Sequence, residues 1–480
     1  MSASWAGRRL HFIAIGGAGM SGLALVARDL GAVVSGSDRS ESSYTERLRA
    51  AGLAPAIGHD AAQVPEDAEV IVSTAIGEDN PELAVARERE QRVLHRGELL
   101  AQVCQGRRLL AVSGTHGKTT TTAMCVHALR AMGADPSYFI GGELPGAGPG
   151  GVASNAGLGE GDWVVAEADE SDASFLELRA EVAVVTNLEL DHHSRWGSLA
   201  ELTDAFERFA EPAIALVAAA EARLQAVGAS RLVRFAIEPP HGAPPPPPAD
   251  LIARGIGATD SGGIRFDLEG AGLGLEVRLA VPGRHNAANA TAALAALAAA
   301  GFDAGAAAGA LSSFGGVARR MELKGERRGA RIYDDYAHHP TEVRAALQAA
   351  REVAPGRLLV AFQPHLYSRT KALAADFGAA LAEADEIAVL EVYPAREQPV
   401  GALEGVTGRS VAEAAAERAG GRTVWWLPDR EGAARALSPR LGPGDTLVTI
   451  GAGDIFRLAE ELVSDQASGH LAANGEEAGG

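Results

Sequence analysis

The sequence predicts an α/β protein built from three domains with parallel β-sheets. A chain of 480 residues is long enough for about two to four domains of ~100 to 200 residues each. Three successive stretches, residues 1–106, 107–316 and 317–465, each alternate short apolar runs with glycine-containing turns and alanine-rich helical segments. This alternation is typical of βαβ units, in which helices connect parallel strands.

The first stretch, residues 1–106, predicts a Rossmann-like domain. Its expected strands cover residues 10–15, 32–36 and 69–74. Gly17-Ala-Gly-Met-Ser-Gly22 follows the first strand and fits the G-x-G-x-x-G pattern, and Asp38 comes about 20 residues later, at the end of the second strand. Taken alone, this pattern indicates an NAD site. The same turn can also hold another diphosphate at the N-terminus of the following helix.

The second stretch, residues 107–316, contains a phosphate-binding motif. Gly114-Thr-His-Gly-Lys-Thr-Thr120 lies between the apolar run 109–112 and a predicted helix over 121–129. Backbone N–H groups at a helix N-terminus bind phosphate oxygens, the Lys118 ammonium adds charge, and the Thr119 hydroxyl can ligate Mg²⁺. Val112 occupies the position of the usual first P-loop glycine. The motif predicts a central ATP-binding domain.

Polar residues end the next two expected strands, residues 162–167 and 182–187. Glu167 opens an acidic segment that continues to Asp172, and His192 follows the second strand. Because ligands of an open parallel sheet bind at the carboxyl ends of its strands, we expect Glu167 at the same edge as the P-loop. Hydroxyl, carboxylate and imidazole groups at this edge are suited to hold cations such as Mg²⁺ beside phosphate oxygens.

The third stretch, residues 317–465, predicts a further α/β domain with strands over 331–336, 358–362, 386–392 and 446–450. Pro244 to Pro248 cannot donate backbone hydrogen bonds, so we expect this run in an extended surface insertion of the second domain. Residues 466–480 are dominated by Gly, Ala and Glu and predict a disordered tail.

Composition excludes several classes of protein. A net charge of −19 repels polyanions and argues against general nucleic-acid binding. The two cysteines, Cys104 and Cys125, cannot form a disulfide framework and fit a reducing compartment. No apolar run predicts membrane insertion or export. We therefore expect a cytoplasmic enzyme that is a monomer or a weak homodimer.

Several motifs of the chain resemble those of the Mur ligase family. The motifs are Gly114 to Thr120, Glu167-Ala-Asp-Glu-Ser-Asp-Ala-Ser-Phe175, Asn187 to His192, Pro282-Gly-Arg-His-Asn-Ala-Ala-Asn289, Arg319-Arg320, Asp334-Asp-Tyr-Ala-His-His-Pro-Thr-Glu342, Phe362-Gln-Pro-His365 and Glu391-Val-Tyr-Pro394. The resemblance implies an N-terminal Rossmann-like UDP-binding domain, a central P-loop ATPase domain and a C-terminal Rossmann-like domain for the amino acid. It also implies ATP-dependent ligation of L-alanine to the lactyl carboxylate of UDP-N-acetylmuramate through an acyl phosphate, in peptidoglycan synthesis. Ala337 and Met321 depart from the glycine and the aromatic residue that are common in the family.

The resemblance also implies roles for individual residues. It assigns ATP to Gly114, Thr115, His116, Gly117, Lys118, Thr119 and Thr120, with adenine at His285, Asn286 and Asn289 and the ribose at Asp334 or Asp335. The expected magnesium ligands are Thr119, Glu167 and His192. Expected substrate contacts are Gly17, Gly19, Met20, Asp38, Ser73, Tyr336, His338 and His339, and the His95-Arg-Gly-Glu98 segment is a further candidate contact of the UDP diphosphate. The expected catalytic residues are Lys118, His192, Glu167, Arg319, Arg320 and His338.

Three alternatives stay open at the level of sequence. A related ligase of cell-wall recycling would attach a preformed peptide to UDP-N-acetylmuramate, and a peptide-accepting assay discriminates it. An NAD-dependent oxidoreductase would use the Gly17 turn but leaves Lys118 unexplained. A non-catalytic sensor of nucleotide sugars would not release ADP in the presence of substrates.

Overall fold

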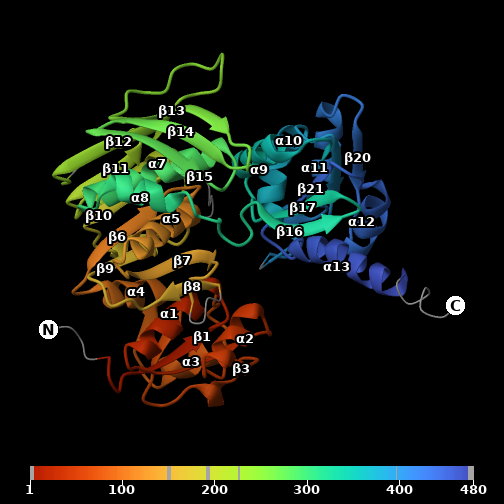
Figure 1. The fold of residues 1–480 in the computed structure, drawn as a ribbon. Helices are drawn as coiled ribbons and strands as arrows, with labels where there is room; N and C mark the ends of the chain where they lie inside the picture. The colour runs from red at the N-terminus through yellow and green to blue at the C-terminus, as the bar shows by residue number, and fades with distance from the viewer. Residues whose placement is uncertain (1–4, 149–152, 191–194, 225–227, 396, 474–480) are drawn as a thin grey trace. The chain divides into compact units, whose positions relative to one another are not determined.

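The computed structural model describes residues 5–148, 153–190, 195–224, 228–395 and 397–473. The described residues form three sheets flanked by helices, as Figure 1 shows. This arrangement confirms the predicted α/β class. The expected strands are present, with ends that differ from the prediction by a few residues.

The N-terminal sheet is entirely parallel and has the strand order β3-β2-β1-β4-β5. Its strands are β1 (Arg9–Ile13), β2 (Val33–Asp38), β3 (Ala56–Ile57), β4 (Glu69–Val72) and β5 (Val93–His95). The helices between them are α1 (Ala18–Asp29), α2 (Ser43–Ala50), α3 (Pro81–Glu88) and α4 (Arg96–Cys104). Apolar residues of α1, α2 and α4 pack on one face of the sheet and those of α3 on the other. Such double coverage is typical of a Rossmann-like domain.

The central sheet has ten strands in the order β15-β14-β13-β12-β11-β10-β6-β9-β7-β8. Its strands are β6 (Arg108–Ser113), β7 (Ser137–Leu144), β8 (Ser154–Gly157), β9 (Trp163–Glu167), β10 (Val182–Val185), β11 (Ala215–Ala219), β12 (Arg231–Ile237), β13 (Leu251–Ala258), β14 (Ile264–Gly270) and β15 (Leu273–Leu279). The helices are α5 (Lys118–Ala131), α6 (Leu199–Ala210), α7 (Arg284–Ala299) and α8 (Ala304–Leu311). Strand β6 pairs in parallel with both β9 and β10, so the carboxyl ends of these three strands meet at one edge.

The C-terminal sheet has six strands in the order β16-β17-β21-β18-β19-β20, with only β16 antiparallel to its neighbour. Its strands are β16 (Glu322–Arg327), β17 (Ala330–Asp335), β18 (Leu358–Phe362), β19 (Glu386–Val389), β20 (Thr423–Trp426) and β21 (Thr446–Ile450). One face is covered by α9 (Pro340–Val353), α10 (Tyr367–Leu381) and α11 (Arg409–Arg418), and the other by α12 (Arg430–Leu437) and α13 (Phe456–Ala473).

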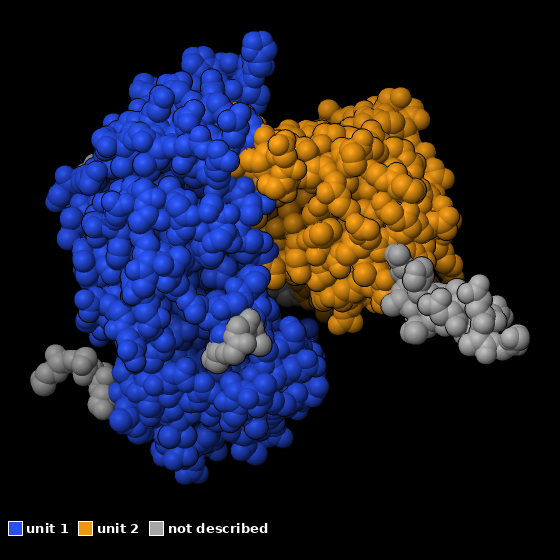
Figure 2. Space-filling model, viewed as in Figure 1, with its two compact units in different colours: residues 1–257, 265–280, 286–317 blue, residues 258–264, 281–285, 318–480 orange. Residues whose placement is uncertain are grey.

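The chain divides into two compact units, coloured in Figure 2. One unit comprises residues 1–257, 265–280 and 286–317, and the other comprises residues 258–264, 281–285 and 318–480. The N-terminal and central sheets belong to the same unit because their helices share one apolar cluster. This cluster joins residues of α1 such as Leu23 to residues of the central sheet such as Val164.

Two segments were predicted to lack regular structure. Pro244 to Pro248 lies between β12 and β13 without helix or strand, as expected. The prediction of a tail from residue 466 is wrong for residues 466–473, because α13 continues to Ala473. Alanine and leucine in this segment are strong helix formers and extend the helix. No helix among the described residues has the length and apolar character needed to span a membrane.

Candidate functional site

The P-loop connects β6 to α5 as predicted. Gly117 is the N-cap residue of α5 and has a left-handed backbone with φ +80. No side chain caps the N-terminus of α5, so its backbone N–H groups are available to an external acceptor. Phosphate oxygens are acceptors of the kind that can bind these N–H groups.

Residues after β10 form one wall of the P-loop. The backbone N–H of His116 donates to Asn187 Oδ1 at 2.8 Å, and Asn187 Nδ2 donates to the His116 carbonyl at 2.8 Å. Thr115 Oγ1 donates to the Glu189 carbonyl at 2.8 Å, and His116 Nε2 lies 3.0 Å from Glu189 Oε2. The two segments therefore hold each other in a fixed conformation around the phosphate site.

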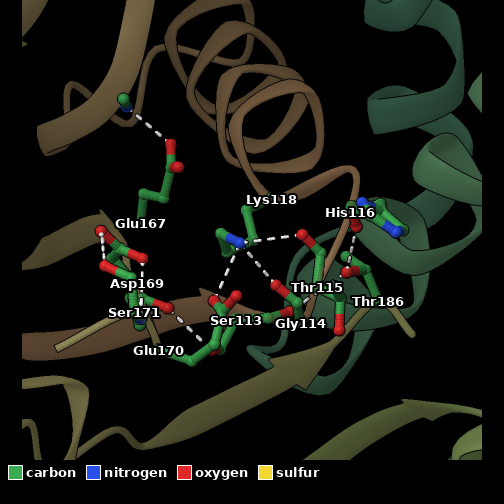
Figure 3. A network of polar contacts seen from close by, with 12 residues as sticks. Ser113, Gly114, Thr115, His116, Lys118, Glu167, Asp169, Glu170, Ser171 and Thr186 are labelled. Atoms are coloured by element: carbon green, nitrogen blue, oxygen red, sulfur yellow. Dashed lines mark hydrogen bonds and ion pairs between the residues drawn. The ribbon is translucent and has the colours of Figure 1, made fainter. Parts of the chain in front are cut away.

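Lys118 is largely buried and points back toward its own loop (Figure 3). Its Nζ donates to the carbonyls of Gly114 at 2.7 Å and Thr115 at 3.0 Å, and lies 2.8 Å from Glu170 Oε2. Burial alone would lower the pKa of Lys118, but the carboxylates of Glu170 and Asp169 raise it, so the side chain is protonated at neutral pH. Burial raises the pKa of Glu170 to about 7, and the Lys118 ammonium offsets only part of this effect.

Thr119 and Glu167 form the oxygen-rich part of the site. Thr119 Oγ1 donates to Glu167 Oε1 at 3.0 Å, and the backbone N–H of Gly141 donates to Glu167 Oε2 at 2.6 Å. Glu167 ends β9 beside the P-loop, as the strand order requires. A hydroxyl and a carboxylate next to a phosphate-binding helix N-terminus are the ligand types that Mg²⁺ prefers, so this pair fits the ion. His192, the third predicted ligand, lies with Asp191 outside the described residues.

Asn286 and Asn289 lie on α7 and are almost completely buried. Asn289 Nδ2 donates to Asn286 Oδ1 at 3.1 Å, and Thr121 Oγ1 donates to Asn289 Oδ1 at 3.4 Å. A Cβ atom added to Gly117 would overlap Asn289 Oδ1, which places Asn289 directly against the P-loop. Thr120, also a predicted ATP contact, is buried in the first turn of α5.

The glycine turn of the N-terminal domain connects β1 to α1. Gly17 is the N-cap of α1 and no side chain caps this helix. Asp38 Oδ2 accepts a hydrogen bond from the Gly16 N–H at 2.9 Å and so holds the turn in place. Gly19 is exposed, whereas Met20 is buried in the core below it. Ser73 lies at the end of β4, where its Oγ accepts from the Ala75 N–H at 3.4 Å.

The C-terminal unit gathers most of its predicted site residues at the carboxyl end of β17. Arg319 Nε donates to Asp334 Oδ2 at 2.9 Å, and its guanidinium lies 4.9 Å from the ring centroid of Tyr336. Asp334 is fully buried and also accepts from Thr449 Oγ1 at 2.7 Å. Asp335 accepts backbone hydrogen bonds from Met321 and Ala337, and burial raises its pKa to about 6.

Glu342 connects the remaining predicted residues of this unit. His338 Nδ1 lies 3.4 Å and Arg320 Nη1 lies 4.0 Å from its carboxylate. His339 is the N-cap of α9 and its Nδ1 accepts from the Thr341 N–H at 3.4 Å. Partial burial and the charge of Arg320 lower the pKa of His285 to about 4, so its imidazole is neutral at physiological pH.

Most of the chain matches known proteins. Residues 9–108 match the Mur ligase family catalytic domain, residues 112–297 the Mur ligase middle domain, and residues 319–453 the Mur ligase glutamate ligase domain. The UDP-N-acetylmuramate–L-alanine ligase of Rubrobacter xylanophilus is 44% identical over 465 residues, covering 95% of this chain and 99% of the relative. The chain belongs to the Mur ligase family.

Solved structures of Mur ligases have the same fold. The UDP-N-acetylmuramate-alanine ligase of Thermotoga maritima aligns with a TM-score of 0.82 and 29% identity, covering 96% of this chain and 99% of that one. A murein peptide ligase of Psychrobacter arcticus aligns with a TM-score of 0.68 and 24% identity, covering 95% and 98%. Membership in a family of ATP-dependent ligases confirms the predicted enzyme class and removes the reason to infer an oxidoreductase from the glycine turn.

Two features of this Mur ligase were missed by the residue assignments made from sequence, and a third, Arg96, has a further contact that the sequence did not predict. Glu342 ends one of the family motifs and had no predicted role, although its carboxylate lies between Arg320 and His338. The Trp196 indole N–H donates to the Glu170 carbonyl at 3.1 Å and fixes the acidic segment. Arg96 binds Asp172 and Asp169 of that segment. Arg96 belongs to the His95-Arg-Gly-Glu98 segment, which the resemblance gives as a candidate contact of the UDP diphosphate, but its pairing with the acidic segment was not predicted.

Proposed function

We propose that this Mur ligase joins L-alanine to the lactyl carboxylate of UDP-N-acetylmuramate in an ATP-dependent reaction of peptidoglycan biosynthesis. The relative from Rubrobacter xylanophilus carries this activity in its name and is similar over nearly its entire length. The single structural observation that carries the proposal is the buried Lys118 at an uncapped helix N-terminus, beside the Thr119 and Glu167 oxygen pair. This arrangement supports phosphoryl transfer from ATP to a carboxylate.

In the proposed reaction the lactyl carboxylate attacks the γ-phosphorus of ATP, which gives an acyl phosphate and ADP. The amine of L-alanine then attacks the acyl carbon, and phosphate leaves as the amide forms. Lys118 must turn from Glu170 and the loop carbonyls to reach the γ-phosphate, where its charge offsets that of the phosphate oxygens. The protein contributes mainly by positioning the reactants.

Magnesium would be held by Thr119, Glu167 and His192, and when bound it neutralises charge on the phosphate oxygens. The P-loop residues Gly114 to Thr120 would bind the phosphates, and Asn286 and Asn289 with His285 would meet the adenine. The ribose would meet Asp334 or Asp335, which are both buried at the end of β17 and both accept hydrogen bonds from within the protein.

The remaining assignments concern the sugar and the amino acid. The diphosphate of the nucleotide sugar is expected at Gly17 to Met20, with Ser73 and Asp38 nearby. Arg319 or Arg320 would stabilise charge on the phosphates, and Tyr336, His338 and His339 would meet the amino acid and the sugar. His338 is held by Glu342 and is a candidate acceptor for the amine proton.

We retain 1–106, 107–316 and 317–465 as the proposed domain boundaries. We also propose a cytoplasmic location and a monomer or weak homodimer. The two cysteines are free and buried, which fits a reducing compartment.

The proposal is tested by phosphate release from the full chain with ATP, Mg²⁺ and UDP-N-acetylmuramate, with either L-alanine or a cell-wall tripeptide as acceptor. We expect release with L-alanine that is abolished in Lys118→Ala. Release only with the tripeptide would assign the chain to the recycling ligases. No release with either acceptor would contradict catalysis and favour a sensor of nucleotide sugars.

A further inference from the structure

Arg96 lies between the glycine turn of the N-terminal domain and the acidic segment of the ATP site. It is the first residue of α4, and its side chain is 24% exposed. Its Nη2 donates to Asp172 Oδ2 at 2.9 Å and to Asp169 Oδ2 at 3.3 Å. Its Nη1 lies 3.1 Å from the position that a Cβ atom would occupy on Gly19. One guanidinium group therefore touches both ligand-binding segments.

Close packing fixes α4 against the acidic segment. Gly97 approaches Ser174 so closely that an added Cβ would lie 3.0 Å from Ser174 Oγ and 3.2 Å from its carbonyl oxygen. The Asp172 side chain is only 3% exposed and also has His95 Nε2 at 3.6 Å. Because this carboxylate is nearly buried between two basic side chains, its pairing with Arg96 is little screened by solvent.

The other edge of the Arg96 guanidinium faces the glycine turn. Among the described residues, neither Nε nor Nη1 of Arg96 donates a hydrogen bond to a protein atom. The turn leads into the uncapped N-terminus of α1. A diphosphate at this turn would meet an arginine edge with unused donors, and arginine can bind two anions through separate edges.

The acidic segment connects Arg96 to the ATP site. Asp169, which Arg96 holds, directly precedes Glu170, the ion-pair partner of Lys118 at 2.8 Å. The same segment begins at Glu167, which accepts from the Thr119 hydroxyl. A change in the position of Arg96 therefore acts on a segment that contacts both the lysine and the hydroxyl of the P-loop.

We propose that Arg96 is a positioning residue that couples the two nucleotide sites: a diphosphate at the glycine turn and the acidic segment of the ATP site bind opposite edges of its guanidinium. The inference rests on the proposed function, since it takes the diphosphate to be that of the UDP-sugar. A diphosphate that immobilises Arg96 also restrains Asp169, whose side chain is 37% exposed, so ATP or ADP binds a segment in which this side chain is already ordered. The coupling is therefore positive, and by linkage it is reciprocal.

The test measures ADP affinity by titration calorimetry of the full chain in Mg²⁺, without UDP and with saturating UDP. We expect UDP to tighten ADP binding at least about fivefold in the unsubstituted protein. In Arg96→Ala the effect of UDP on ADP affinity should fall below about twofold. Arg92→Ala is the matched control, because this exposed arginine pairs with Glu69 and has the same charge. It should keep the full coupling.

Two further variants separate coupling from simple damage to the site. Asp172→Asn leaves Arg96 and the turn intact but weakens the link to the acidic segment, so UDP should still bind while the coupling falls. Arg96→Lys keeps the positive charge but replaces the guanidinium, which has two donor edges, by a single ammonium group. This variant should also retain UDP binding with reduced coupling. Full coupling in Arg96→Ala or Asp172→Asn, or no effect of UDP on ADP affinity in the unsubstituted protein, would overturn the inference.

These measurements need neither L-alanine nor turnover. A chain that binds UDP and ADP with Arg96-dependent coupling but releases no phosphate with L-alanine would contradict the proposed function alone. A chain that releases phosphate normally without coupling would contradict only the role of Arg96.

Discussion

Substitution of Gly117 by alanine tests whether the ATP site depends on the left-handed backbone at the start of α5. Gly117 has φ +80, a conformation that costs an L-residue about 1 to 2 kcal/mol. The new Cβ would overlap Asn289 Oδ1 and lie 3.3 Å from Asn289 Cγ. Asn289 cannot retreat without disturbing its hydrogen bonds to Asn286 and Thr121. Overpacking of this kind costs about 1 to 3 kcal/mol more.

Gly133→Ala is the matched control at the other end of α5. Gly133 has φ +76, and no heavy atom lies within 4 Å of an added Cβ. The control therefore isolates the backbone cost of about 1 to 2 kcal/mol. The difference between the two variants reports the clash with Asn289 alone.

The assays are the midpoint of thermal unfolding and ADP affinity by titration calorimetry. Each kcal/mol of lost stability should lower the midpoint of thermal unfolding by roughly 2 to 4 °C in a domain of about 150 to 250 residues. Gly117→Ala should lower it further than Gly133→Ala. Gly117→Ala should also weaken ADP binding by about tenfold or more, since about 1.4 kcal/mol corresponds to that factor. If the two variants have the same midpoint and both bind ADP normally, the P-loop does not depend on Gly117 as we argue.

Three other predictions concern single contacts. Thr119→Val removes the hydroxyl beside Glu167 and should raise the Mg²⁺ concentration for half-maximal phosphate release about tenfold, whereas an unchanged magnesium titration would exclude Thr119 as a ligand. Trp196→Phe removes the indole donor to the Glu170 carbonyl and should lower stability by about 1 kcal/mol and phosphate release severalfold; wild-type values of both would show that this bond does not hold the acidic segment. Burial raises the pKa of Asp335 from 3.8 to about 6, so the native protein binds more protons than the unfolded chain in this interval and the free energy of unfolding falls as pH rises through it. Asp335→Asn should lack this contribution, which unfolding midpoints of both proteins at about pH 4.5 and about pH 6.5 will test, and equal pH dependence would contradict the raised pKa.

The sequence by itself determined the features that depend on local pattern. The P-loop at Gly114 to Thr120 was predicted because an apolar strand, a glycine turn and a helix are contiguous in the chain. The position of Glu167 beside it followed from the rule that parallel strands present their carboxyl ends at one edge. The extension of α13 through residues 466–473 was missed because composition outweighed helix propensity in that segment.

The tertiary structure alone decided which distant groups meet. Lys118 and Glu170 lie on different segments, and their pairing depends on β6 and β9 being neighbours in the sheet. Asn289 is 168 residues from Thr121, yet α7 places it against the P-loop. Arg96 and Asp172 are 76 residues apart and meet because the helices of the N-terminal domain share a core with the central sheet. Strand order and packing between distant segments depend on the free energy of the whole fold. A local sequence pattern does not determine them.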